Sequence, residues 1–337
     1  MHYTVLIFVG IYFESCFSKG NCTMKLLCHK INLIFFLSLS LFISSVSAAE
    51  KNVILKPFTL AKTYTGKNLS QVATIVNGQL IKAGFKVVGI YEPYTTTKIY
   101  IVTDKTLLNT AAKTEFGGFG ATIRVSVTEK NNQIQVVHNN PTYMSLAYNM
   151  KGRLSSTRQL LAKTLGYEKD FGGEGIESNK LPDYNYAFGL EGFKGFMDLA
   201  EHKSHKEALK AVEAGFAKGL KSMKKVYRVD IPGKKQSVFG ISLTNDINDQ
   251  KFLNDKFVMD IIDSKDLRRS AHLPYELMVV DKRVIIMHPH FRLAVNFPDL
   301  RMFGKHSFGK LMDLPYVYEE FFIQLAGGTW PIPDEEY

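Results

Sequence analysis

The stretch Gln135 to Tyr148, QVVHNNPTYMSLAY, reads as a strand that runs into a tight polar turn and continues as an aromatic-rich helix. Further along the chain, Ile285 to Phe297, IIMHPHFRLAVNF, shows the same order of strand, polar residue, proline and helix. The second stretch reads as a diverged copy of the first, in which a strand, a tight polar turn and a helix follow one another. The repeated pattern indicates that the chain contains one unit in two copies.

The regions before these two stretches also match in the order of their elements. Each begins with a helix whose apolar residues recur at spacings of 3, 4 and 4, which places them on one face. These residues are Leu69, Val72, Val76 and Leu80 in the first unit, and Leu209, Val212, Phe216 and Leu220 in the second. Helix starts are predicted by the capping pairs Asn68 and Gln71, Ser156 and Gln159, and Ser204 and Glu207. Two strand pairs follow each opening helix, so we predict an internal duplication.

The chain therefore divides into five predicted parts. They are an N-terminal extension with a signal peptide over 1–49, a first α+β unit over 50–168, a connector over 169–200, a second, diverged α+β unit over 201–330, and an acidic tail over 331–337. The connector is rich in glycine and aromatic residues and has no sustained period, which predicts a segment lying over the surface.

The N-terminal region has the layout of a secretory signal. From Met24 a short basic start precedes an apolar run, Ile31 to Ile43, and small residues that end at a predicted cleavage after Ala48 or Ala49. This run of 13 residues is shorter than the roughly 20 that a membrane-spanning helix needs, which disfavours an uncleaved anchor. We therefore expect translation to begin at Met24 and the protein to be periplasmic or secreted.

All three cysteines, Cys16, Cys22 and Cys28, precede the predicted cleavage point. A cleaved chain has no cysteine, which excludes disulfides and thiol catalysis. The net charge is +10 for the whole chain. Cleavage removes three lysines and one glutamate, which leaves 39 basic and 31 acidic residues, or +8. This modest excess of positive charge permits contact with anionic lipid, but it does not indicate a particular fold.

No catalytic motif stands out. The glycine loops FGGFG and FGGEG lack the lysine and the serine or threonine of a phosphate-binding loop, and the chain has no Gly-x-Ser-x-Gly motif. His288 and His290 would share one face of a strand and form a metal pair, but Pro289 breaks regular strand pairing. No carboxylate or cysteine accompanies them at ligand spacing, so we expect neither a metal ion nor a cofactor.

The first unit resembles a known family. FGGFGATIRVSVTE, followed by QVVHNNPTYMSLAYNM, is similar to the signature region of the bacterial domain of unknown function 302 family, over about residues 53 to 168. The matching positions are Gly117, Gly118, Gly120, Asn140, Pro141 and Tyr143. The resemblance implies an α+β fold of two tandem units like the TATA-binding protein, each a curved antiparallel sheet with helices on one face. It implies no activity. The second unit departs from it, with His288 in the place of Asn140 and Phe291 in the place of Tyr143.

Strand alternation predicts which side chains face away from the helices. Ile123, Val125 and Val127 are predicted to face the helices in the first unit, as are Tyr275, Leu277 and Val279 in the second. Arg124 and Glu276 then occupy corresponding positions on the open faces. We expect these opposite charges either to pair across a pseudo-twofold axis or to line a cleft, unless both are solvated surface residues.

Two functions from different classes fit this sequence. The first is an exported, non-catalytic envelope protein that binds a small ligand, a lipid or a partner in a cleft between the units. Its candidate binding residues are Arg124, Asn140, Tyr143, Tyr148, His272, Glu276, His288 and His290. The alternative is a hydrolase-like enzyme with a site around His272, His288 and His290 at the interface of the units. We also expect peripheral membrane contact, but no nucleic acid, because an exported chain rarely meets DNA.

Overall fold

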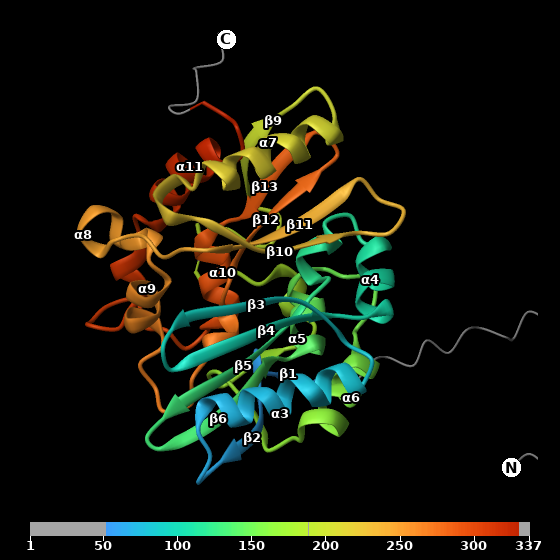
Figure 1. Ribbon diagram of the computed structural model, residues 1–337, viewed down its shortest axis with the longest axis vertical. Coiled ribbons are helices and arrows are strands. Elements are labelled where there is room, and N and C mark those ends of the chain that lie inside the picture. The colour runs from blue at the N-terminus through green and yellow to red at the C-terminus, as the bar shows by residue number, and fades with distance from the viewer. Residues whose placement is uncertain (1–51, 188, 330–337) are drawn as a thin grey trace, which may run out of the picture. The chain divides into compact units, whose positions relative to one another are not determined.

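The computed structural model describes residues 52–187 and 189–329, and shows a mixed α+β protein with antiparallel sheets (Figure 1). The predicted signal peptide and acidic tail lie outside the described residues. Within the described part of the chain, no helix is both long and apolar enough to cross a membrane.

The first sheet has six strands in the order β3-β4-β5-β6-β2-β7. They are β2 (Phe58–Tyr64), β3 (Lys86–Tyr94), β4 (Thr97–Thr103), β5 (Ile123–Lys130), β6 (Gln133–Asn139) and β7 (Lys169–Phe171). Asn131 and Asn132 join β5 to β6 with positive φ angles of 52° and 59°, which suits the right-handed twist of a two-residue hairpin. Strands β5 and β6 thus form an antiparallel hairpin, one of the strand pairs predicted after the first helix.

The second sheet has five strands in the order β10-β11-β12-β13-β9. They are β9 (Phe196–Glu201), β10 (Lys224–Asp230), β11 (Gln236–Ser242), β12 (Tyr275–Val280) and β13 (Arg283–Met287). When strands are matched in chain order from β2 and from β9, the spatial order is the same in both sheets. A separate pair joins β1 (Ile54–Leu55) to β8 (Ile176–Glu177).

The α-helices of the described residues are α3 (Leu69–Lys82), α4 (Lys105–Ala112), α5 (Pro141–Ala147), α6 (Ser155–Leu165), α7 (His205–Lys218), α8 (Ile247–Gln250), α9 (Asp255–Ile262), α10 (Pro289–Asn296) and α11 (Leu314–Leu325). Two of them cover the outer face of each sheet. Helices α3 and α6 contact each other and the first sheet, while α7 and α11 contact each other and the second sheet. Figure 1 shows these two pairs on opposite sides, with the sheets between them.

The inner faces of the two sheets are buried, so the expectation of open faces is wrong. Arg124 of β5 and Glu276 of β12 are 2% and 1% exposed, and their neighbours on the same faces are also buried. Short 3-10 turns fill the space between the sheets. The turn η1 (Gly117–Gly120) of the first unit contacts β11 and β12, and η5 (Ser270–His272) of the second contacts β4, β5 and β6. Apolar residues of both sheets form one large buried cluster, and a second, smaller cluster contains Phe58, Leu60, Val137, Phe171 and Ala271.

The helix starts follow the predicted caps at two of three places. Asn68 and Gln71 form a reciprocal capping box at α3, and Ser204 accepts from the Glu207 N–H at α7. The predicted cap at Ser156 is wrong, because the N-cap of α6 lies two residues earlier, at Leu154, which has a φ of 51° and no side-chain cap bond.

The predicted connector is also partly wrong, because its ends are strands. Strand β7 pairs with β2 and extends the first sheet, while β9 pairs with β13 and forms an edge of the second. The predicted boundary at residue 201 thus falls on the last residue of β9. Both strands are short and aromatic, so their sequences show no alternation that identifies them.

The buried face of α7 differs from the predicted one. Its buried residues are Ala208, Val212 and Gly215, whereas Leu209 and Phe216 are only partly buried. A Cβ added at Gly215 would lie 2.0 Å from the Leu325 carbonyl oxygen of α11. Small residues face the core here because the backbones of α7 and α11 approach too closely for larger ones.

We expect Gly215→Ala to lower the free energy of unfolding by about 1–3 kcal/mol, because the new methyl group forces α7 and α11 apart. Gly78→Ala on α3 is the matched control: no atom lies within 4 Å of its added Cβ. That substitution should raise the stability by about 0.5–1 kcal/mol. Urea denaturation measures both values, and equal effects of the two substitutions would contradict the close contact.

Candidate metal centre

Seven of the eight predicted binding residues are buried, and His288 is partly buried. Three of the buried ones have structural roles. Asn140 caps α5 by accepting from the Thr142 N–H at 3.2 Å, and the Tyr143 hydroxyl donates to the Val295 carbonyl oxygen at 2.9 Å. Tyr148 stacks on Phe193 with ring centroids 5.5 Å apart. A ligand could reach these side chains only if the core rearranged.

Arg124 and Glu276 form a buried ion pair between the units. Arg124 Nη2 donates to Glu276 Oε2, and the Tyr227 hydroxyl donates to Glu276 Oε1. The two side chains are 3% and 0% exposed. Of the arrangements that the strand alignment allowed, pairing is the one observed. The contact holds the two sheets together and leaves no polar group facing a cleft.

His272 lies in the core beside Arg292. Arg292 Nη1 is 3.1 Å from His272 Nε2, and Arg292 Nη2 donates to the His272 carbonyl oxygen at 2.6 Å. These residues and Asp255 line an enclosed cavity of about 10 Å³, which is at the lower limit for a single water molecule. Burial, followed by the Arg292 charge, lowers the pKa of His272 well below its ordinary value. The cavity has no room for a substrate.

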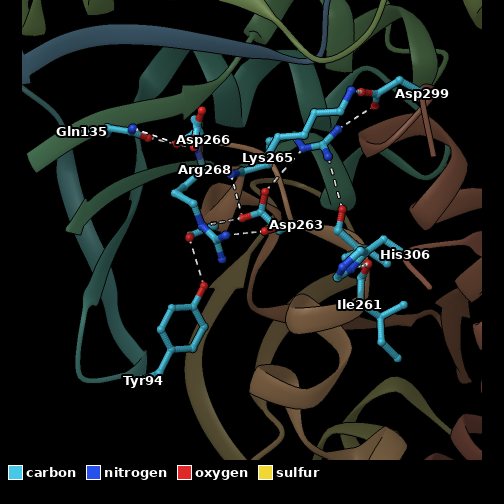
Figure 2. A network of polar contacts seen from close by, with 12 residues as sticks. Tyr94, Gln135, Ile261, Asp263, Lys265, Asp266, Arg268, Asp299 and His306 are labelled. Carbon is cyan, nitrogen blue, oxygen red and sulfur yellow. Dashed lines mark hydrogen bonds and ion pairs between the residues drawn. The ribbon is translucent and has the colours of Figure 1, made fainter. Parts of the chain in front are cut away.

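A third polar network fastens the loop after α9 to the first sheet (Figure 2). The Gln135 side chain of β6 donates to the Asp266 carbonyl oxygen and accepts from the Arg268 N–H, both at 2.9 Å. Figure 2 shows the Asp263 carboxylate facing the Arg268 guanidinium, and the distance from Arg268 Nε to Asp263 Oδ2 is 3.3 Å. Burial raises the pKa of Asp263. Its charges are paired, so we assign this network to the junction of the two units.

The remaining two histidines lie together at the start of α10. His288 is the N-cap residue and accepts from the His290 N–H through Nδ1 at 3.3 Å, and Pro289 is at the first helical position. Pro289 therefore starts a helix here and does not interrupt a strand. The ring centroids of His288 and His290 are 5.0 Å apart. The helix start thus brings two imidazoles side by side.

Glu191 of the connector completes this group. Its Oε2 atom lies 3.2 Å from His288 Nδ1 and 3.8 Å from His290 Nδ1. One potential ligand atom from each of the three residues lies within 4.8 Å of the other two. Glu191 was not predicted as a ligand because it lies far from the histidines in the sequence, in an irregular segment. No local signal distinguished it, because the connector contains five other acidic residues, Asp170, Glu174, Glu177, Asp183 and Asp198.

The electrostatics of this group favour a bound cation. Within the described residues, Glu191 Oε2 is shielded from solvent and has no hydrogen-bond donor. The lone pair of His288 Nδ1 is used to accept from an amide, so two electron-rich atoms face each other 3.2 Å apart. A proton on Nδ1 would satisfy one contact and displace the amide. A divalent cation bound to all three ligand atoms would likewise replace the amide at Nδ1, and it would supply positive charge to Glu191 Oε2, which has no donor among the described residues.

Both imidazoles are held in the neutral form that binds metals. Burial lowers the pKa of His288 to about 4, against the opposing effect of Glu191. Burial also lowers the pKa of His290. Metal–nitrogen bonds of about 2.0–2.1 Å in a tetrahedral site place neighbouring ligand atoms about 3.3 Å apart. The two Oε2 to Nδ1 distances, 3.2 and 3.8 Å, lie close to this value.

The surroundings combine an apolar wall with an accessible side. Phe308 packs on His290 with centroids 5.2 Å apart, and Tyr186 stacks on Phe308 at 4.4 Å. The Glu191 side chain is 36% exposed, which leaves a route for an ion and a position for a further ligand. Two imidazoles and one carboxylate suit Zn²⁺ and also Fe²⁺.

Comparisons of the chain with protein-family models, curated proteins and solved structures find no match. Its function is therefore inferred from the geometry of this group.

Proposed function

We propose that the protein is a non-catalytic metal-binding protein that holds one divalent transition-metal ion, in the first instance Zn²⁺, at Glu191, His288 and His290. The convergence of three ligand atoms on a buried carboxylate oxygen without a donor carries this proposal. Because the core encloses the other candidate residues, a metal ion takes the place of the small ligand or lipid expected in a cleft. An exported protein with a cleaved signal peptide, periplasmic or secreted, fits the layout of the N-terminal region.

We further propose that the two units are tandem copies of one module like the TATA-binding protein, related to the domain of unknown function 302 family. The shared strand order supports this relation. So do the two helix starts, where Asn140 caps α5 and His288 caps α10, each followed by proline. On this basis the metal centre arose in the second copy, when histidine replaced the capping asparagine.

Metal analysis of the purified chain tests the proposal. We expect native mass spectrometry and elemental analysis to find one Zn²⁺ per chain after equilibration with zinc and removal of the excess. His288→Asn is the sharpest variant, because asparagine is the cap at the matching position of the first unit and removes only the imidazole. Glu191→Gln keeps the size of the side chain and removes its charge.

Both variants should bind zinc more than about 100-fold more weakly, because changes one shell further out already cost about 10–100-fold. His205→Gln is the control, since His205 lies outside the group and contacts the Asp281 carbonyl oxygen. Isothermal titration calorimetry gives the affinities. A wild-type chain that takes up no stoichiometric zinc would overturn the proposal.

Hydrolysis is a second candidate, favoured by the exposed side of Glu191. A zinc ion with three protein ligands retains a position for water, whose pKa it lowers to about 7. Turnover of activated esters or phosphoesters by the zinc-loaded wild type, absent in His288→Asn, would support this candidate over simple binding.

A further inference from the structure

The segment between α10 and α11 forms a structured loop with an exposed aromatic tip. Its base is held by Phe308 N–H donating to the Arg301 carbonyl oxygen at 2.8 Å, and by Gly309 N–H donating to that of Met302 at 2.9 Å. Phe303 at the tip is 84% exposed, more than any other large apolar side chain in the described residues. Gly304 follows with a φ of 116°, which a side chain would strain. The backbone therefore holds Phe303 out in solvent.

The loop is also anchored to a neighbouring helix. His306 Nδ1 lies 3.1 Å from the Ile261 carbonyl oxygen of α9, and η6 (Phe308–Leu311) contacts the same helix. Figure 2 shows His306 beside Ile261. The tip thus extends from a fixed base, and its position does not depend on the order of a free chain end.

Basic side chains surround this tip. Arg301, Lys305 and Lys310 are exposed, and the sequence from Arg301 to Met312 contains no acidic residue. Met312, 43% exposed, adds a second apolar side chain. Of the flanking acids, Asp299 is paired with Arg269 at 2.6 Å and also with Lys265, while Asp313 is exposed. The loop therefore carries positive charge around an apolar point.

We propose that this loop, residues 301–312, docks the protein on an anionic lipid surface. Phe303 enters the boundary between headgroups and acyl chains, while the three basic residues contact lipid phosphates. A protein partner fits less well, because a stable interface buries about 800 Å² on each side around a packed centre, and this tip is a single protruding side chain. The proposal does not require a bound metal ion, although Phe308 at the base of the loop packs on His290.

Vesicle flotation tests the proposal, with the chain purified from its host after any processing there. We expect binding to vesicles that contain phosphatidylglycerol, weaker binding to phosphatidylcholine alone, and loss of binding at high salt. Phe303→Ala should weaken binding about tenfold or more, because the apolar contact is removed. Tyr167→Ala is the matched control, since Tyr167 is an exposed aromatic residue, at 53%, elsewhere on the surface.

A second variant, Lys305→Glu, separates the two contributions. It should reduce binding to anionic vesicles and leave any residual binding to neutral vesicles unchanged. Undiminished binding by Phe303→Ala, or equal binding to both kinds of vesicle, would overturn the proposal. The proposal would also be overturned if the chain bound neither kind of vesicle but bound a protein partner through Phe303. That result would assign the loop to a protein interface.

Discussion

Glu276→Ala is expected to lower the free energy of unfolding by about 3–5 kcal/mol, because it leaves the Arg124 guanidinium buried without a counter-charge. Glu276 also accepts from the Tyr227 hydroxyl, which loses its acceptor in the same variant. Both effects act at the centre of the contact between the two sheets. A surface pair of the same chemistry contributes far less, since water and salt screen it.

The matched control is Arg283→Met, which breaks the contact of Arg283 with Asp198, whose side chains are 42% and 57% exposed. We expect a loss below about 1 kcal/mol there. The double variant Arg124→Met with Glu276→Met should recover most of the stability lost by Glu276→Ala, because it removes both charges from the core. Urea denaturation of the four proteins decides the matter, and a loss for Glu276→Ala no greater than for Arg283→Met would contradict the buried pair.

The stability of the protein is expected to fall by about 3 kcal/mol between pH 3 and pH 7 through Asp255 alone. Burial raises the pKa of this carboxyl from 3.8 to about 6, although the Tyr91 hydroxyl and the Leu243 N–H donate to it at 2.5 and 3.1 Å. Below the unfolded pKa, both states carry the neutral acid, and the contribution is fully present. As the pH rises through the folded pKa, the carboxylate must ionise in the core, and the stability is lost.

Asp255→Asn removes this titration while keeping an oxygen that can accept both hydrogen bonds. Subtracting its stability from that of the wild type, across the pH range, isolates the contribution of Asp255. Asp260→Asn on the same helix is the control, because Asp260 is 58% exposed and forms only a surface pair with Lys256. If the difference in unfolding free energy between wild type and Asp255→Asn stayed constant with pH, the pKa of Asp255 would be the same in the folded and unfolded states, which would contradict the prediction.

Local features were predictable because they depend on residues close together in the sequence. The cap at Asn68, the hairpin turn at Asn131 and Asn132, and the direction of each side chain along β5 and β12 follow from backbone geometry over a few residues. The same features predicted that Arg124 and Glu276 occupy corresponding positions in the two halves of the chain. The burial of that pair was not predictable, because alternation tells which way a side chain points and not what covers it.

By itself, then, the sequence determined the α+β class, the helix caps at Asn68 and Ser204, and the hairpin turn at Asn131 and Asn132. Tertiary structure alone decided that the inner faces of the sheets are buried, that α7 buries Gly215 more deeply than Phe216, and that Glu191 lies beside the two histidines. Each of these depends on how closely backbones distant in the sequence approach one another. That distance is set by packing over the whole molecule and leaves no periodic signal in the chain.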